Sequence, residues 1–173
     1  MSKISDNIAS LSENEVRIIA ELEFKKKYYF TREDIKHHFD KKSKVSYAIH
    51  RLIAKKRIVK LNRNKYCLIP MKAKTGRWTD DPFIIADEMF EGKDYYIGGW
   101  AAAHYWKLTE QIPMKIEIFT NKRNGSSKTL TETFIFKKTT LKRIDEAIIR
   151  TISNHSFKIL SKKRSKQWLK TRK

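Results

Sequence analysis

The sequence predicts a mixed α+β fold with two structured domains and a short basic tail. Its 173 residues are 40% hydrophobic and 12% aromatic, which is enough apolar surface for packed cores. Helix-capping signals recur early in the chain, and short apolar runs separated by turn residues follow them. The composition also changes from basic to neutral near residue 71. We therefore expect domains over residues 1–72 and 78–160 and a tail over residues 161–173.

The positive charge is distributed unevenly. Of the formal net charge of +20, residues 1–70 carry +9, residues 71–136 carry none and residues 137–173 carry +11. From Lys41 to Thr79 there are 13 Lys and Arg residues and no Asp or Glu. Solubility does not require such an interval, because surfaces of mixed sign are soluble too. The interval predicts a surface that meets an anionic partner, with nucleic acid as the leading expectation and a solvated lysine-rich face as the alternative.

Two capping signals predict the first helices. Ser12 and Glu15 have the spacing of a capping box, in which each side chain accepts a hydrogen bond from the other residue's backbone. Thr31 and Asp34 repeat the device. The predicted helices cover residues 13–25 and about 32–39.

A third helix is predicted over about residues 44–56. Val45, Ile49, Leu52 and Ile53 form one apolar stripe at helical spacing. The residues off this stripe are cationic, hydroxyl-bearing or aromatic, and such groups contact phosphates and base edges. They are Lys44, Ser46, Tyr47, His50 and Arg51.

A basic hairpin follows the third helix. Residues 58–61 and 66–69 are apolar runs, residues 62–65 are prone to turn, and Pro70 ends the second run. Helix, helix, basic helix and hairpin is the order of a winged helix-turn-helix. In that motif the later helix enters the major groove of DNA and the hairpin lies on the backbone. The acid-free interval covers the same two elements, so the pattern predicts double-stranded DNA as the partner.

The predicted DNA-binding residues divide into two groups. Tyr47, Ser46, His50 and Lys44 are the candidates for contacts with base edges. The candidates for phosphate contacts are Lys41, Lys42, Arg51, Lys56, Arg57, Arg63 and Lys65. Ser43 and Asn64 complete the predicted site at the helix start and the hairpin tip.

The neutral middle segment predicts a small α+β domain. Asp81 and Pro82 are start signals for a helix that reaches Phe90. Gly98-Gly99 before the next helix suits close backbone packing under Trp100 better than a phosphate cradle, since it lacks the rest of a P-loop. Further expected elements are a strand over 94–99, a helix over 100–108, and strands over 114–120 and 130–136 that form a hairpin or small sheet, so that the domain has a short antiparallel sheet.

Residues 95–113, which read YYIGGWAAAHYWKLTEQIP, resemble a family of regulators. The stretch is similar to the Y-Y-I-G-hydrophobic-A-A-x-H-x-x-L-T-E-Q-I-P segment of the AbiEi family, the antitoxins of type IV toxin–antitoxin systems and related regulators. Residues 31–70, including Tyr66, are similar to that family's winged helix in pattern. The resemblance implies a DNA-binding domain that represses its own operon at inverted repeats. It also implies a C-terminal domain that counteracts a nucleotidyltransferase toxin.

The last 37 residues are the most basic segment. Apolar residues at 141, 144, 148 and 152 predict an amphipathic helix. Residues 162–173 mix cations with Trp168 and Leu169 and suit a DNA-backbone arm, a membrane-surface segment or a solvated tail. Members of the AbiEi family often continue into a longer C-terminal domain, whereas this sequence has a short basic segment there. A stand-alone winged-helix regulator without antitoxin activity is therefore an alternative.

No catalytic or metal-binding set is expected. The five histidines lack a carboxylate or cysteine at metal-ligand spacing, and Cys67 is the only cysteine. His37 and His38 are neighbours on a predicted helix, so their side chains are expected to point about 100° apart and not to chelate together. The expectation is a protein that is not an enzyme and needs no cofactor.

The sequence predicts a cytoplasmic DNA-binding transcriptional regulator, and the resemblance to the AbiEi family implies that it acts as autorepressor and antitoxin. It shows no signal peptide and no apolar run of about 18 residues, so no membrane association is expected. RNA binding by the two basic ends is a further alternative. The oligomeric state is open, because no heptad stripe identifies a dimer interface.

Overall fold

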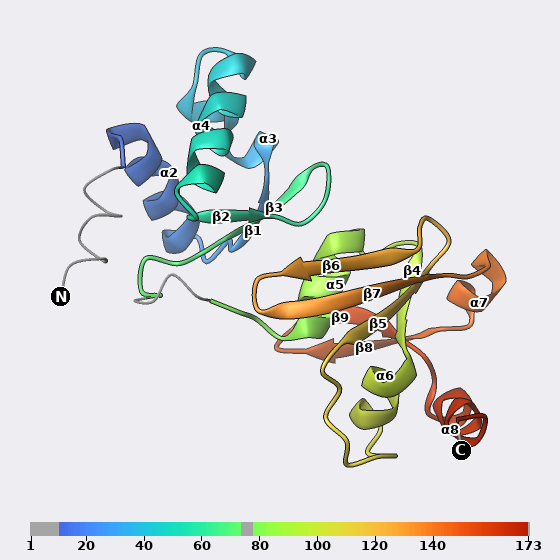
Figure 1. Cartoon of the computed structure of the whole chain (residues 1–173). Helices are drawn as coiled ribbons and strands as arrows, with labels where there is room; N and C mark the ends of the chain where they lie inside the picture. The colour runs from blue at the N-terminus through green and yellow to red at the C-terminus, as the bar shows by residue number, and fades with distance from the viewer. Residues whose placement is uncertain (1–10, 74–77, 173) are drawn as a thin grey trace. The chain divides into compact units, whose positions relative to one another are not determined.

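The computed structural model describes residues 11–73 and 78–172, and its fold is mixed α+β, as predicted (Figure 1). The chain divides into two compact units, unit 1 (Met1–Trp78) and unit 2 (Thr79–Lys173). Each unit has its own β-sheet, three-stranded in unit 1 and six-stranded in unit 2.

Unit 1 combines helices with a small antiparallel sheet in the order β1-β3-β2. Both predicted capping boxes are present: Ser12 pairs with Glu15, and Thr31 pairs with Asp34. The helix predicted over 32–39 is a single α-turn followed by a 3-10 turn. The elements are α2 (Glu13–Phe24), β1 (Tyr29–Thr31), α3 (Arg32–Ile35), η1 (Lys36–His38), α4 (Lys42–Ala54), β2 (Ile58–Lys60) and β3 (Lys65–Leu68).

The core of unit 1 forms where the helices meet the sheet. Ile18 and Leu22 of α2 and Leu52 of α4 are at most 3% exposed and share one apolar cluster. Phe30 of β1 joins this cluster, with its ring centroid 5.7 Å from that of Tyr66 on β3. The core therefore holds α4 by one face and leaves its opposite face to solvent.

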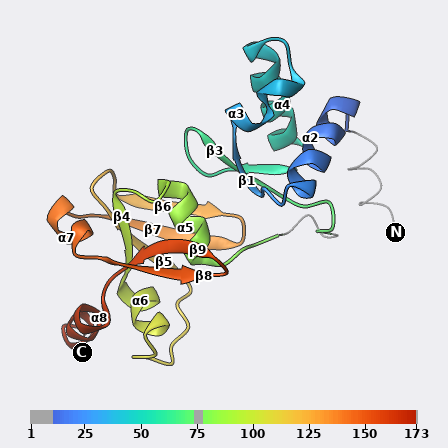
Figure 2. The same cartoon turned by 180° about the vertical axis from the view of Figure 1, so that it is seen from behind.

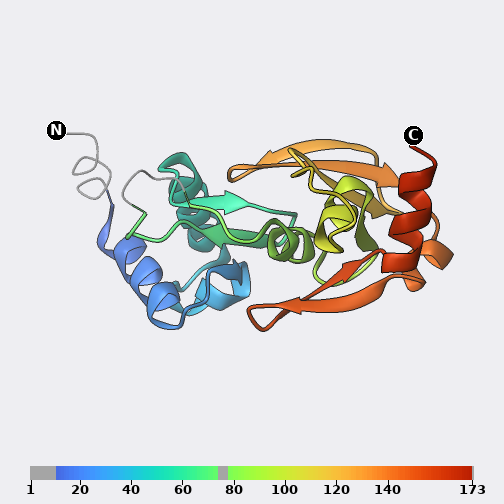
Figure 3. The ribbon, with the colours of Figure 1, turned by 90° about the horizontal axis from the view of Figure 1, so that it is seen from below.

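Unit 2 contains a mixed sheet in the order β6-β7-β5-β4-β9-β8. Its pairs are antiparallel except β4 with β9 and β5 with β7. Figure 3 shows α5 and α6 between the β6–β7 hairpin and the β8–β9 hairpin. The elements are α5 (Pro82–Phe90), β4 (Tyr95–Gly98), α6 (Gly99–Tyr105), β5 (Ile116–Thr120), β6 (Gly125–Thr129), β7 (Glu132–Lys138), α7 (Leu141–Asp145), β8 (Ile148–Ile152), β9 (His155–Ile159) and α8 (Lys162–Lys170).

The strands predicted over residues 114–120 and 130–136 share a sheet, but the hairpin and the antiparallel order are wrong. β5 and β7 are parallel neighbours, and the hairpin partner of β7 is β6. The β6 sequence Gly-Ser-Ser-Lys-Thr has no apolar alternation, so the sequence indicated only a turn there. An edge strand pairs through its backbone and can leave its side chains in solvent, which hides it from hydrophobic patterning.

The predicted amphipathic helix over residues 141–152 is also wrong beyond Asp145. α7 ends at Asp145, and Ile148–Ile152 form the edge strand β8, which Figure 2 shows in hairpin with β9. A spacing of four residues satisfies both a strand and a helix, so periodicity alone does not distinguish them. The β-branched residues of β8 favour the strand.

The predicted basic tail is a helix of unit 2. Ser161 caps α8 by accepting a hydrogen bond from the backbone of Arg164, and Ser165 is fully buried. The ring of Trp168 meets that of Trp100 on α6 edge-on, with centroids 5.4 Å apart. A stripe of Ser165, Trp168 and Leu169 at helical spacing explains why the segment packs instead of remaining solvated.

Candidate functional site

The exposed face of α4 is the first feature of the candidate site. Its buried stripe consists of Val45, Ala48, Ile49 and Leu52, so Ala48 takes the place predicted for Ile53, which is 38% exposed. The opposite side of the helix lies in solvent and carries the predicted base-edge residues. We call this surface the α4 face; it consists of Ser43, Lys44, Ser46, Tyr47 and His50, all exposed.

A hydrogen-bonded chain leads from α2 to the α4 face. Glu15 is only 2% exposed, and its carboxylate accepts hydrogen bonds from Arg51 Nε at 3.2 Å and Lys55 Nζ at 2.6 Å. Arg51 also donates to the hydroxyl of Tyr47 at 3.3 Å. Burial acts to raise the pKa of Glu15, but the hydrogen bonds from Lys55 and Ser12 outweigh it, and the pKa is lowered. An ionised Glu15 thus orients Arg51, which orients Tyr47.

Four of the seven predicted phosphate-binding cations lie in solvent, three at the ends of α4 and one in the β2–β3 turn. Lys41, Lys42, Lys56 and Arg63 are exposed and form no ion pair with another described residue. Lys44 is exposed too and pairs with Asp40 at 2.8 Å. Surface pairs of this kind are weak, so a phosphate can replace the carboxylate at little cost.

Arg57 is buried and therefore not placed to contact phosphate, which differs from the prediction. Its side chain is buried, with the residue 6% exposed, and donates to the carbonyl of Ile69 at 3.0 Å and to the sulfur of Met71. Burial lowers the pKa of its guanidinium. The sequence shows a cation in a basic interval, but only the fold shows that this cation joins the end of α4 to the segment after β3.

The turn between β2 and β3 presents the remaining predicted residues. The side-chain oxygen of Asn62 accepts hydrogen bonds from the backbone of Asn64 at 2.7 Å and Lys65 at 2.8 Å. This Asx turn fixes the tip and leaves Arg63 and Asn64 exposed. The tip is therefore a basic, well-defined projection beside β3.

Two exposed cations were missed. Arg32, at the start of α3, donates to the hydroxyl of Tyr66 at 3.3 Å, and Lys60 pairs with Tyr66 across the β2–β3 ladder. Lys60 lies inside the acid-free interval, which was the signal available for it. Arg32 lies outside the acid-free interval and is followed by Glu33 and Asp34, so only the β1–β3 pairing reveals its position.

Replacing Lys56 can separate the effect of backbone strain on stability from the effect of the lost side chain on nucleic-acid binding. It has φ +55° just after α4, and Lys26 has φ +52° just after α2. We expect Lys56→Gly and Lys26→Gly each to stabilise the protein by about 0.5–1 kcal/mol, because glycine adopts this conformation without steric cost. Only Lys56→Gly should also weaken nucleic-acid binding. Urea unfolding and a binding titration measure both effects, and equal binding by the two variants would remove Lys56 from the site.

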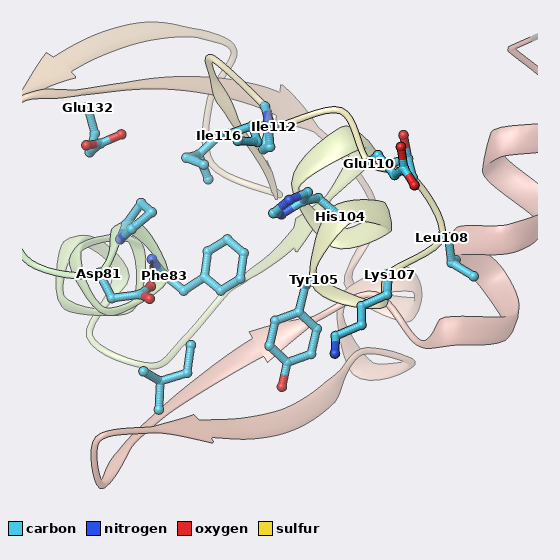
Figure 4. A pocket seen from close by; sticks show the side chains of 14 residues that line it. Asp81, Phe83, His104, Tyr105, Lys107, Leu108, Glu110, Ile112, Ile116 and Glu132 are labelled. Atoms are coloured by element: carbon cyan, nitrogen blue, oxygen red, sulfur yellow. Dashed lines mark hydrogen bonds between the residues drawn. The ribbon is translucent and has the colours of Figure 1, made fainter.

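Unit 2 contains an open groove of about 980 Å³. His104 and Phe83 face each other across it in Figure 4, and Ile112 and Glu110 lie on its rim. Most of the stretch from His104 to Pro113 lines this groove. The second half of the stretch that carries the family resemblance thus lines a cavity, and the first half is mostly buried core.

Gly98-Gly99 is a site of close packing, as preferred from the sequence. Gly99 has φ +59°, and a Cβ there would lie 1.4 Å from a carboxylate oxygen of Glu117. That carboxylate accepts the backbone hydrogen bond of Trp100 at 2.9 Å and pairs with Lys137. Glu117 therefore occupies the position in which a phosphate cradle would hold its anion.

The expectation that His37 and His38 diverge is wrong. They lie in η1 instead of a regular α-helix, and their ring centroids are 4.3 Å apart. Both Nε2 atoms approach Oε2 of Glu21 on α2, at 2.8 and 2.5 Å. The carboxylate of another element draws the two rings together, which sequence spacing cannot show.

No protein-family model matches this chain, and no curated protein matches its sequence. Across the described residues, no helix combines the length and apolarity needed to cross a bilayer.

Proposed function

We propose that this protein is a winged helix-turn-helix transcriptional regulator that binds double-stranded DNA through unit 1. The observation that carries the proposal is the α4 face, whose Ser46, Tyr47 and His50 all lie in solvent while the opposite stripe is buried. α3, η1 and α4 supply the helical pair, α4 supplies the recognition helix, and the β2–β3 turn supplies the wing. The exposed cations at both ends of α4 and on the wing suit contacts with the phosphate backbone on either side of the major groove.

Salt dependence tests the electrostatic part of this proposal. Because Arg57 is buried, we exclude it from the phosphate candidates. Six candidates remain, namely Lys41, Lys42, Arg51, Lys56, Arg63 and Lys65. Neutralising six phosphates gives a slope of about −5 in a plot of log affinity against log salt concentration. Titrations with the chain's own promoter DNA measure it. A slope near zero, or no binding to that promoter, would contradict the proposal.

Replacing a base-edge candidate should change DNA binding in a different way from replacing a phosphate candidate. Tyr47→Ala should lower affinity for the operator by about 10- to 100-fold and change binding to unrelated duplex little, because a base-edge contact is lost. Arg63→Ala should lower affinity for both duplexes alike and reduce the salt slope by about 1. Competition titrations with the two duplexes measure the specificity ratio. The same ratio in both variants would contradict this division of roles.

RNA binding is the alternative for the same cations. An A-form helix has a major groove too narrow for α4, so duplex RNA should compete poorly. RNA that competes as well as operator DNA would favour the alternative.

Autorepression and antitoxin action are a second candidate function. It is supported by the resemblance of residues 95–113 to the AbiEi family and by the groove that this stretch lines in unit 2. The full chain, co-expressed with a nucleotidyltransferase toxin from a neighbouring gene, should restore growth. Ile112→Asp, at a groove residue that is 73% exposed, should abolish protection and leave DNA binding intact. Met114→Asp, at an exposed residue outside the groove, is the matched control. If the protein is a stand-alone regulator, neither the unchanged chain nor the Ile112→Asp variant should restore growth.

A further inference from the structure

Three side chains of unit 1 direct ligand atoms to one point between α2 and η1. Glu21 lies on α2, and His37 and His38 form the end of η1. Their carboxylate oxygen and two imidazole nitrogens all lie within 4.8 Å of one another. Sixteen residues separate Glu21 from His37, so the fold, and not local sequence, assembles the cluster.

Both imidazoles approach the same carboxylate oxygen of Glu21. His37 Nε2 is placed for a hydrogen bond at 2.8 Å. His38 Nε2 is a buried atom that lies 2.5 Å from the same oxygen. Lys25 already neutralises the carboxylate through its other oxygen, Oε1. The two imidazole rings lie close together, with centroids 4.3 Å apart.

We propose that Glu21, His37 and His38 form a binding site for a divalent transition-metal ion, with Zn²⁺ as the best fit. Two imidazoles and one carboxylate are a protein ligand set of open tetrahedral zinc sites, in which water takes the fourth position. Imidazole ligands favour zinc, cobalt, nickel and copper over magnesium and calcium. A neutral imidazole offers the lone pair that a metal ion requires.

The surroundings of the cluster suit an ion. The Glu21 carboxylate is already oriented by hydrogen bonds from Lys25 and His37. Lys25 binds Oε1 and leaves Oε2 for the metal, as an outer partner that orients the ligand. The His37 side chain is 53% exposed, which gives the ion a path from solvent. Because the present separations are shorter than the ~3.3 Å edge of a zinc tetrahedron, small side-chain rotations accompany binding.

The site joins α2 to the segment that leads into α4. Only residues 39–41 separate η1 from α4, and Lys41 and Lys42 at this junction are phosphate candidates. An ion that clamps η1 to α2 restrains the start of α4. The effect on DNA rests on the proposed function, and operator affinity should rise when the site is filled.

Metal binding is tested first without DNA, on the full untagged chain. Calorimetric titration with Zn²⁺ should give one ion per chain, and Co²⁺ should give the visible absorption of a tetrahedral nitrogen–oxygen site. Glu21→Gln and His38→Ala should each weaken binding by about 100-fold or more. His50→Ala, which removes an exposed histidine of the α4 face, is the matched control and should bind as the unchanged chain does.

A second measurement protects against variants that do not fold. Zn²⁺ should raise the melting temperature of the unchanged chain and of His50→Ala, and Mg²⁺ should not. Circular dichroism reports whether the triple variant Glu21→Gln/His37→Ala/His38→Ala is folded. If the unchanged chain takes up no Zn²⁺ or Co²⁺, or if the folded triple variant takes up either equally, the proposal is overturned. Neither outcome depends on DNA binding, so a failure of the metal-site proposal can be distinguished from a failure of the proposed function.

Discussion

Replacing Lys41, Lys42 and Arg63 together by alanine is expected to reduce DNA affinity by about 500-fold at 0.1 M salt. Each lost phosphate contact removes about 0.9 from the slope of log affinity against log salt concentration, so three contacts flatten it by about 2.7. The loss should be alike on operator and unrelated duplex and should disappear near 1 M salt. Titrations over a series of salt concentrations measure both the slope and the affinity.

A matched triple variant separates contact from overall charge. Lys93, Lys115 and Lys142 are exposed lysines of unit 2, and replacing them by alanine removes the same three positive charges. This control should keep the steep slope, because the released counterions belong to contacted phosphates. If both triple variants lose affinity equally, the exposed cations of unit 1 do not form a contact surface.

Glu15→Ala is expected to destabilise unit 1 by about 3 kcal/mol, the second large effect. The substitution leaves Lys55, whose side chain is 15% exposed, without its carboxylate, and it removes half of a capping box. Glu13→Ala on the same helix removes a carboxylate that is 79% exposed and should cost at most about 0.5 kcal/mol. Urea unfolding measures the difference. Equal costs would show that the Glu15 ion pairs contribute nothing.

The same carboxylate predicts how stability depends on pH. The pKa of Glu15 is lowered in the folded protein from its ordinary value of 4.5. A lowered folded-state pKa means that the stabilisation is complete above pH 4.5 and is lost as pH falls through the folded-state pKa. Glu15→Gln keeps a capping side chain without the charge and should flatten this dependence. Because Glu15 also orients Arg51, the variant should weaken the specificity contributed by Tyr47.

The elements of unit 1 were largely predictable, because local rules determine them. The Ser12–Glu15 capping box and the stripe of Val45, Ile49 and Leu52 predicted α2 and α4 within about two residues. The strand β1 was not predicted, because three residues are too few to show a period. In unit 2, β6 and β8 were missed, since edge strands are stabilised by backbone pairing with a neighbour that is distant in the sequence.

The candidate site divides in the same way. Charge and exposure of the α4 face follow from composition and helical period, so Ser46, Tyr47, His50 and the cations around them were predicted from sequence. Arg57 was predicted wrongly, because only the fold shows that it is buried against Ile69 and Met71. The convergence of His37 and His38 on Glu21 was excluded by a rule for regular helices that does not hold in η1.

The sequence by itself determined that α2, α4, α5 and α6 are helical, where the positive charge lies and which face of α4 is polar. These properties depend on residue type and on spacings of a few residues. Only the tertiary structure decided the pairing of β5 with β7, the packing of α8, the role of Arg57 and the cluster of Glu21 with two histidines. Each of these depends on which distant segments meet, and that is set by burial of the whole apolar surface at once and not by any local pattern.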